Sequence, residues 1–187
     1  MSSSMMDTIQ FAYEGADVHR FHTRPGIRSN TDGQHSWGVA LLVWLLTGDT
    51  PRAEVLLAAL THDLGEHVVG DVPRPTKIFL GLGNSLDRLE DGARAKYGLD
   101  FHELLTPAEA RVLKLADMLD GLLWCAREAG LGSKMTRVMY YHWHEGIQAF
   151  APLSSREAEV VDAVSGIWIQ STSPGGPRSF ASGHDSL

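Results

Sequence analysis

Most of the chain carries apolar residues with the spacing of an amphipathic helix, and the strict alternation of a half-buried strand is sustained nowhere. Residues 35–47 are apolar on almost every side, which predicts a central helix. Two stretches, 23–34 and 68–79, hold clusters of Pro and Gly with polar residues and are predicted to be loops. The pattern predicts helices over residues 6–22, 35–47, 51–67, 85–97, 107–129 and 155–170, with a further helix that opens at Ser133.

The signals at the helix ends agree with this division. Thr106 is followed three residues later by Glu109, which is the pattern of a capping box, and the same pattern recurs at Ser154. These signals predict one all-α domain of six or seven helices over residues 1–170. The tail 171–187 is rich in Ser, Gly and Pro and is predicted to be disordered.

Composition and charge narrow the class of protein. The 187 residues are 43% hydrophobic and 21% charged, as expected of one globular domain. The 23 acidic and 16 basic residues give a net charge of -7, which argues against a nucleic-acid polymer as the partner. The single Cys125 allows no internal disulfide and favours the cytoplasm. The longest apolar run, 39–46, is too short to span a bilayer, and residues 1–10 lack the pattern of an export signal, so no membrane association is predicted.

Ionisable residues gather at the end of the predicted helix 51–67. His62, Asp63 and Glu66 directly follow an apolar run, and burying such groups is costly unless they are paired. Glu66 comes four residues after His62 and three after Asp63, so its side chain projects onto the same helix face. The cluster is either part of a functional site or a polar helix end, and its spacing alone does not decide between the two.

Two other residues supply partners for this cluster. His35 stands between a polar loop and an apolar run, where it is either a site residue or a capping or surface histidine. Asp117 lies inside an apolar helix, where a carboxylate needs a cation, and Asp120 on nearly the same face is either a supporting residue or solvated. Together with His62 and Asp63, these side chains suit a divalent ion such as Mn²⁺, Co²⁺, Fe²⁺ or Zn²⁺.

The order of these residues resembles a known signature. His35, His62-Asp63 and Asp117 match the H…HD…D pattern of the HD-domain metal-dependent phosphohydrolases. The stretch 62–77, HDLGEHVVGDVPRPTK, is similar to the HD-x-x-E-x-x-x-G-D-x-P-x-P-x-K stretch of the small 5′-deoxynucleotidases, which the compact phage dATP triphosphohydrolases share. The resemblance implies an HD-domain helical bundle.

Smaller elements extend the resemblance on both sides. Arg20-Phe21 falls where these families carry an Arg-aromatic pair, and Lys114 precedes Asp117 as in their K-x-x-D element. The similarity therefore covers residues 20–125. It specifies the superfamily more closely than it specifies the substrate.

The resemblance also implies a role for each matching residue. The metal would be held by His35, His62, Asp63 and Asp117, and the catalytic residues would be Asp63 and Glu66, with Glu66 transferring the proton. Cationic side chains would face phosphate oxygens, where they stabilise developing negative charge, and Asp71 would contact the sugar 3′-hydroxyl. The residues that would contact substrate are Arg20, Phe21, Asp71, Lys77 and Lys114.

Two departures bear on the substrate. The 5′-deoxynucleotidases usually have Trp after the Arg, packed on the deoxyribose, whereas this chain has Phe21, so selectivity for the deoxy sugar is left open. The stretch between Lys77 and Asp117 is shorter than in typical bacterial monophosphatases, which favours the compact phage enzymes.

The implied activity is hydrolysis of the 5′-phosphate or 5′-triphosphate of a deoxynucleotide by metal-activated water, leaving a deoxynucleoside. The partner would be this small molecule, with Mn, Co, Zn, Fe or Mg as the metal, and the enzyme would be a homo-oligomer in a bacterial or phage-infected cytosol. One alternative is an HD phosphohydrolase of a cyclic nucleotide or alarmone, which the GDxPxPxK stretch opposes. The other is a non-catalytic regulatory HD protein that binds nucleotides, which the presence of all four ligands and Glu66 opposes.

Overall fold

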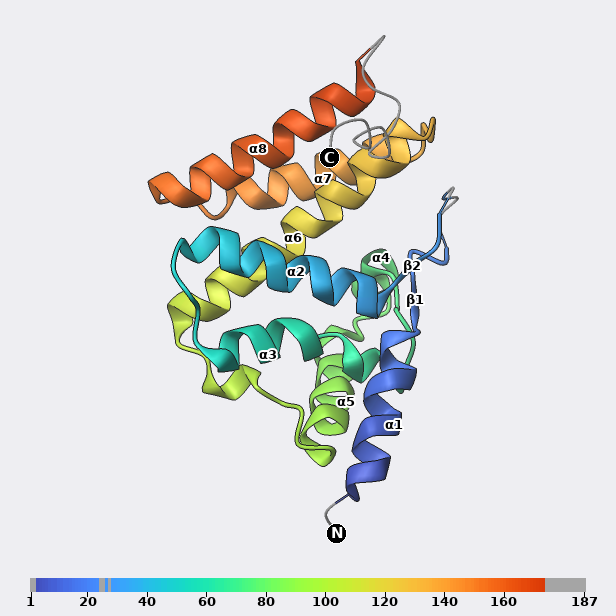
Figure 1. The fold of residues 1–187 in the computed structure, drawn as a ribbon. Helices are drawn as coiled ribbons and strands as arrows, with labels where there is room; N and C mark the ends of the chain where they lie inside the picture. Colours follow the sequence, from blue (N-terminus) through green and yellow to red (C-terminus); the bar gives the residue numbers. More distant parts are fainter. Residues whose placement is uncertain (1–2, 24–25, 27, 174–187) are drawn as a thin grey trace, which may run out of the picture.

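The long helix α6 (Pro107–Gly130) forms the spine of the protein in a computed structural model, which describes residues 3–23, 26 and 28–173 (Figure 1). Helix α2 (Asp32–Thr47) crosses it, and α7 (Thr136–Gln148) and α8 (Ser155–Thr172) run antiparallel to each other and both pack against α6. The remaining elements of the described chain lie on the other side of α2. They are α1 (Met5–Ala16), β1 (His19–Arg20), β2 (Asn30–Thr31), α3 (Ala53–Thr61), the 3₁₀ helix η1 (Leu64–His67), α4 (Arg74–Phe79), α5 (Gly83–Lys96) and the 3₁₀ helix η2 (His102–Leu104).

The core lies where α2 meets α6. Val39 and Val43 of α2 and Leu115 and Leu119 of α6 are completely buried, as their helix positions predict. Cys125 of α6 is also buried, and burial raises the pKa of its thiol to about 12. Helix α2 is central, as predicted, where it meets α6 and α3, whereas Trp37, Leu41 and Trp44 are exposed on another side of it.

The predicted capping boxes are present. The side chain of Thr106 accepts the backbone N–H of Glu109, Ser154 does the same for its helix, and both helices begin at the next residue. A third capping box joins Thr31 to Gln34, so α2 begins three residues before the predicted start at His35. The all-α prediction is confirmed, with eight α-helices in the described residues against six or seven predicted.

The N-terminal helix is shorter than predicted. It ends at Ala16, and residues 17–22 leave the helix to form β1, which pairs antiparallel with β2. The predicted loop 23–34 contains the second strand, β2, and the start of α2. Strands of two residues leave no period-two pattern in a sequence, which is why the hairpin was not predicted.

The predicted helix over 51–67 is interrupted. Helix α3 begins only at Ala53 and ends at Thr61, and the chain then tightens into η1. In a continuous α-helix, neighbouring side chains diverge by about 100°. The break at His62-Asp63 lets both side chains reach one place, since their Nε2 and Oδ2 atoms lie 3.4 Å apart.

Other boundaries shift by smaller amounts. The predicted loop 68–79 contains α4, because Pro73 serves as its N-cap residue and Pro75 lies in its first turn, where no backbone N–H is needed. The helix predicted from Ser133 begins at Thr136, and the last helix runs two residues past the predicted boundary at 170. Residues 174–187 of the predicted tail lie outside the described residues. Within the described chain, no helix is both long and apolar enough to cross a membrane.

Candidate active site

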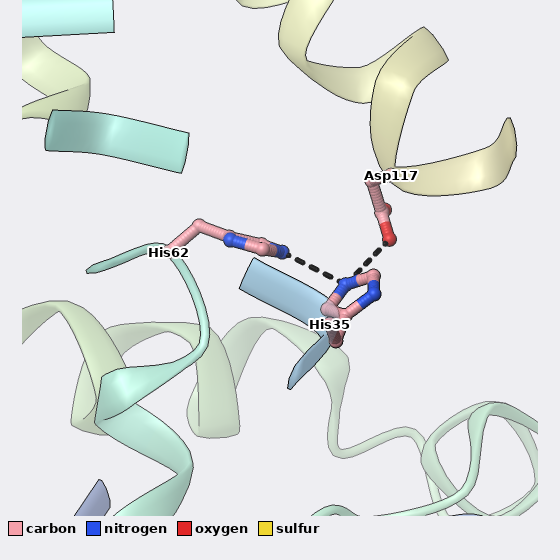
Figure 2. Close-up of side chains that lie close together, drawn as sticks. All are labelled: His35, His62 and Asp117. Atoms are coloured by element: carbon pink, nitrogen blue, oxygen red, sulfur yellow. Dashed lines mark hydrogen bonds and ion pairs between the residues drawn. The ribbon is translucent and has the colours of Figure 1, made fainter. Parts of the chain in front are cut away.

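Two histidines and an aspartate converge at the centre of the fold from α2, the end of α3 and α6 (Figure 2). His35 comes from the first turns of α2, His62 follows the last residue of α3, and Asp117 lies midway along α6. His35 Nε2 lies 3.1 Å from His62 Nε2 and 3.3 Å from Asp117 Oδ1. We call His35, His62 and Asp117 the histidine cluster.

Each histidine is oriented by a hydrogen bond through its other ring nitrogen. His35 Nδ1 lies 2.6 Å from Asp120 Oδ2, and His62 Nδ1 lies 2.8 Å from the carbonyl oxygen of Ala59. Both acceptors require a proton on Nδ1, so the two Nε2 atoms are the ones that face the site. Asp120, which the sequence left open, is therefore a supporting residue of His35.

The approach of Asp120 to His35 depends on Gly38. A Cβ atom at position 38 would fall well inside contact distance of Asp120 Oδ1. Glycine thus lets α6 bring this carboxylate against the first turns of α2. The need for glycine here arises from helix–helix packing, since no unusual backbone angle is involved.

The histidine cluster holds a proton of its own. Burial and Arg20 disfavour the charged form of His35, yet the surrounding carboxylates, Asp117 foremost, outweigh them and raise its pKa to about 9. Burial lowers the pKa of His62, so that ring is neutral at pH 7 and its Nε2 is free to accept a hydrogen bond. His35 therefore donates toward His62 and Asp117, from the position where both histidines would bind an ion.

The donor atoms fit a divalent ion. Asp63 Oδ2 joins the histidine cluster at 3.5 Å from His35 Nε2 and 3.4 Å from His62 Nε2. For bonds of about 2.1 Å, tetrahedral ligand atoms are separated by about 3.4 Å. His35 Nε2 lies 3.1–3.5 Å from a donor atom of each of the other three residues, and two imidazole nitrogens with two carboxylates are a suitable donor set for a borderline divalent metal.

A second group of acidic side chains adjoins the first. Asp32, Asp63 and Glu66, which we call the carboxylate cluster, bring one oxygen each within 4.8 Å of one another. Arg20 of β1 lies among them: its guanidinium donates to Asp63 Oδ2 and lies 3.6 Å from Asp32 Oδ1. Both oxygens of Asp32 and Oε2 of Glu66 are buried without a hydrogen-bond partner among the described residues.

The electrostatic environments of these acids differ. Burial, followed by the charges of Asp63 and Asp32, raises the pKa of Glu66 to about 9. Burial and the charge of Asp63 raise the pKa of Asp32 to about 7, although Arg20 opposes the change. Burial also disfavours the charged form of Asp63, but Arg20 and the protonated His35 outweigh it and hold the pKa of Asp63 well below its usual range. One acid of the cluster is therefore firmly ionised, while Glu66 keeps a proton at neutral pH.

The turn after β1 borders the site. Phe21 adopts a left-handed backbone angle, φ 55°, which is rare for a residue with a bulky side chain. Its backbone N–H donates to Asp71 Oδ2 at 2.8 Å, and its ring stacks on Trp124 of α6 with the centroids 4.2 Å apart. These two contacts hold the strained turn beside the carboxylate cluster.

The two lysines predicted to contact substrate are paired with acidic side chains. Lys77 Nζ lies 3.3 Å from Glu90 Oε1, with most of its side chain covered. Lys114 Nζ lies 2.6 Å from Asp117 Oδ2, and 57% of its side chain is exposed. The structure thus brings His35, His62, Asp63 and Asp117 together and leaves Lys77 and Lys114 at the border.

Sequence reasoning missed Asp32. Its side chain is completely buried beside Arg20, but in the sequence it stands in a polar loop, where a solvated carboxylate is the ordinary expectation. Trp124 is buried in the core, and its ring also stacks on Phe21. Only the fold of the β1–β2 hairpin brings Arg20 to Asp32 and Phe21 to Trp124.

Comparisons with known proteins agree with this geometry. A family model described as 5′-deoxynucleotidase YfbR-like matches residues 16–160. A dATP triphosphohydrolase of Salmonella phage PMBT28 is 33% identical over 152 residues, which cover 73% of this chain and 76% of the phage protein.

Solved structures share the fold at lower identity. The HD phosphohydrolase DatZ of cyanophage S-2L, bound to dA and one catalytic Zn²⁺ ion, superposes with a TM-score of 0.65 at 18% identity, covering 90% of this chain and 98% of DatZ. The PH0347 protein of Pyrococcus horikoshii OT3 superposes with a TM-score of 0.66 at 21% identity, covering 88% of this chain and 98% of that protein.

Proposed function

The chain belongs to the YfbR-like 5′-deoxynucleotidase family, and we propose that it is a divalent-metal-dependent phosphohydrolase that releases a deoxynucleoside from a 5′-phosphorylated deoxynucleotide. The observation that carries this proposal is the convergence of two imidazole Nε2 atoms with the carboxylates of Asp63 and Asp117. Such a donor set has no simple role in packing, since it places several ionisable groups together inside the protein.

The proposed ligands are His35, His62, Asp63 and Asp117. When bound, a divalent ion activates water for attack at neutral pH and polarises a phosphoryl oxygen. Zinc is the first metal to test, because DatZ is bound to a catalytic Zn²⁺ ion. Manganese, cobalt, iron and magnesium are the other candidates, and mixed nitrogen and oxygen donors suit several of them.

Glu66 is the proposed proton-transfer residue. Its carboxyl group is buried beside Asp63, with one oxygen lacking a partner among the described residues. Burial and the neighbouring carboxylates raise its pKa to about 9, so a proton is available at neutral pH for the 5′-oxygen as that oxygen leaves phosphorus.

Arg20, Phe21 and Asp71 are the proposed substrate contacts nearest the metal ligands. The buried guanidinium of Arg20 is already fixed by Asp63, so it presents positive charge to phosphate without a large rearrangement. Asp71 accepts a hydrogen bond from the backbone of Phe21, and this contact supports a joint role of the two residues in binding the sugar. Lys77 and Lys114 would add positive charge at the border.

A dATP-type triphosphate is the leading substrate, with a deoxynucleoside and inorganic triphosphate as products. The phage relative named a dATP triphosphohydrolase supports this choice, as does the short stretch between Lys77 and Asp117. The matching family model is described as 5′-deoxynucleotidase YfbR-like, so a deoxynucleoside monophosphate is the second candidate substrate.

The test is a panel of deoxynucleoside monophosphates and triphosphates assayed with Zn²⁺, Mn²⁺, Co²⁺, Fe²⁺ and Mg²⁺ in turn. Release of triphosphate from dATP is expected, whereas release of phosphate from a monophosphate would select the second candidate. The variant Asp63→Ala is expected to lose both metal binding and turnover, because Asp63 contacts both clusters. Full activity of Asp63→Ala would disprove the metal-dependent mechanism.

Assembly into a homo-oligomer and a cytoplasmic location complete the proposal. The exposed Trp37, Leu41 and Trp44 on one side of α2 support assembly, since large apolar side chains grouped on a surface are typical of interfaces. Light scattering on the purified protein tests it, and a monomeric mass at micromolar concentration would contradict it.

A further inference from the structure

Helix α5 differs from every other long helix of the described chain in what it buries. It contributes no apolar side chain to the core, and its two buried residues are Glu90 and Arg94, which are 8% and 5% exposed. These residues are four positions apart and therefore share one face. Burying a charged side chain is costly unless it has a hydrogen-bonding or oppositely charged partner, so both residues need such partners on the neighbouring elements.

Arg94 reaches the backbone of a proposed metal ligand. Its Nη1 donates to the carbonyl oxygen of His62 at 2.6 Å, and its Nη2 donates to Asp91 one turn earlier on α5. His62 caps the C-terminus of α3, where carbonyl groups lack helical partners and carry partial negative charge. The guanidinium satisfies one of these carbonyls.

A second contact fixes α5 against the same segment. At Gly65, between Asp63 and Glu66, an added Cβ atom would lie 2.6 Å from both Cα and the carbonyl oxygen of Glu90. The backbones of η1 and α5 are therefore in close contact. The segment from His62 to Glu66 is thus held from outside the site at both of its ends.

From these contacts we infer that Arg94 is a positioning residue for the metal centre, holding the backbone of His62 so that its Nε2 faces His35 and Asp117. The ring of His62 is already tied to α3 through Ala59, and Arg94 ties its backbone to α5. With both attachments in place, the imidazole has one orientation before an ion arrives. The inference rests on the proposed metal site.

The test compares the wild type with Arg94→Ala and Arg94→Lys. Co²⁺ affinity is measured by calorimetry, the geometry of bound Co²⁺ by its visible spectrum, and folding by thermal unfolding of the metal-free protein. Arg94→Ala is expected to weaken Co²⁺ binding by about 10–100-fold, as other supporting residues of metal ligands do, and to change the spectrum. Arg94→Lys keeps a positively charged hydrogen-bond donor and is expected to retain part of the affinity. Arg88→Ala, an exposed position on the same helix, is the control and should bind as the wild type does.

The outcomes separate the two proposals. Wild-type affinity and spectrum in Arg94→Ala, with only a lower unfolding temperature, would overturn the positioning role and leave the metal site intact. Failure of the wild type itself to bind any divalent ion would instead overturn the proposed function. If Arg94→Ala does not fold, Arg94→Gln, which keeps a hydrogen-bond donor without the charge, decides the same question by the same measurements.

Discussion

The histidine cluster and the carboxylate cluster meet at Asp63, which belongs to the second and contacts both histidines of the first. The two clusters are nevertheless organised in opposite ways. Each histidine has a second partner that fixes its ring, Asp120 for His35 and the Ala59 carbonyl for His62. In the carboxylate cluster, Asp32 and Glu66 have buried oxygens without hydrogen-bond partners in the described chain. The first arrangement suits a ligand set held in one geometry, and the second suits a group that gains and loses a proton.

The pKa values follow the same division. His35 and Lys114 favour the ionised form of Asp117, whose pKa lies well below its usual range although burial opposes this. Burial dominates for Glu66 and raises its pKa. A buried carboxylate of this protein is thus ionised where cations surround it and protonated where other acids surround it. The ionised Asp117 is suited to bind a metal, and the protonated Glu66 is suited to act as an acid.

Replacement of Glu66 by Gln gives the largest expected separation between the clusters. The amide keeps the size of the side chain but transfers no proton, so kcat is expected to fall by about 10²–10⁴-fold. Affinity for Co²⁺, measured by calorimetry, should remain close to that of the wild type. Glu103→Gln, at an exposed position, is the control. Equal loss of metal binding and turnover in Glu66→Gln would show that the two clusters are not functionally distinct.

Removal of Asp120 is expected to weaken the histidine cluster by a smaller amount. In Asp120→Ala, His35 Nδ1 loses its acceptor, and metal affinity is expected to fall by about 10–100-fold. Gly38→Ala should act in the same direction, since its methyl group pushes Asp120 away from His35.

The control for the glycine change is Gly92→Ala, where an added Cβ meets nothing within 4 Å. Alanine in the middle of α5 should leave metal affinity unchanged. Unchanged affinity in both Asp120→Ala and Gly38→Ala would mean that the orientation of His35 does not depend on Asp120.

The smallest expected effect concerns the stability of the metal-free protein. The pKa of Glu66 is raised from 4.5 to about 9, so its contribution to stability is complete below pH 4.5 and is lost as the pH rises through 9. The free energy of unfolding, from urea denaturation in EDTA, should therefore fall between pH 5 and pH 9 more steeply in the wild type than in Glu66→Gln. If the free energy of unfolding depended on pH equally in the two proteins, the pKa of Glu66 would not be raised by folding. His35, whose pKa is also raised, is present in both proteins and cancels in the comparison.

The sequence predicts the helices that have strong end signals, and it singles out the proposed metal ligands because their side chains have distinctive chemistry. Thr106 and Ser154 mark their helices correctly because a capping box is a local interaction. The break at His62 was not predicted, because it depends on the packing of η1 against the backbone of α5 at Gly65.

The roles of Asp32 and Arg94 could not be predicted for a related reason. Each stands in a polar stretch, where an exposed charge is the ordinary expectation, and each is buried only because a distant element covers it. Arg20 of the hairpin lies over Asp32, and the chain after α3 meets Arg94. Charged residues that support a site from outside the motif therefore need the tertiary structure to be recognised.

Helix α6 connects both sides of the proposed site. Asp117, Asp120 and Trp124 are spaced by three and four residues, so they lie on one face and span about 10 Å along the axis. Asp117 and Asp120 contact the two ring nitrogens of His35, and Trp124 stacks on the ring of Phe21. A rigid helix moves them together, so a shift caused at one position is felt at the others. The effects of substitutions at these three positions on metal affinity are therefore expected to be non-additive. A double-mutant cycle would measure the coupling energy between each pair of positions.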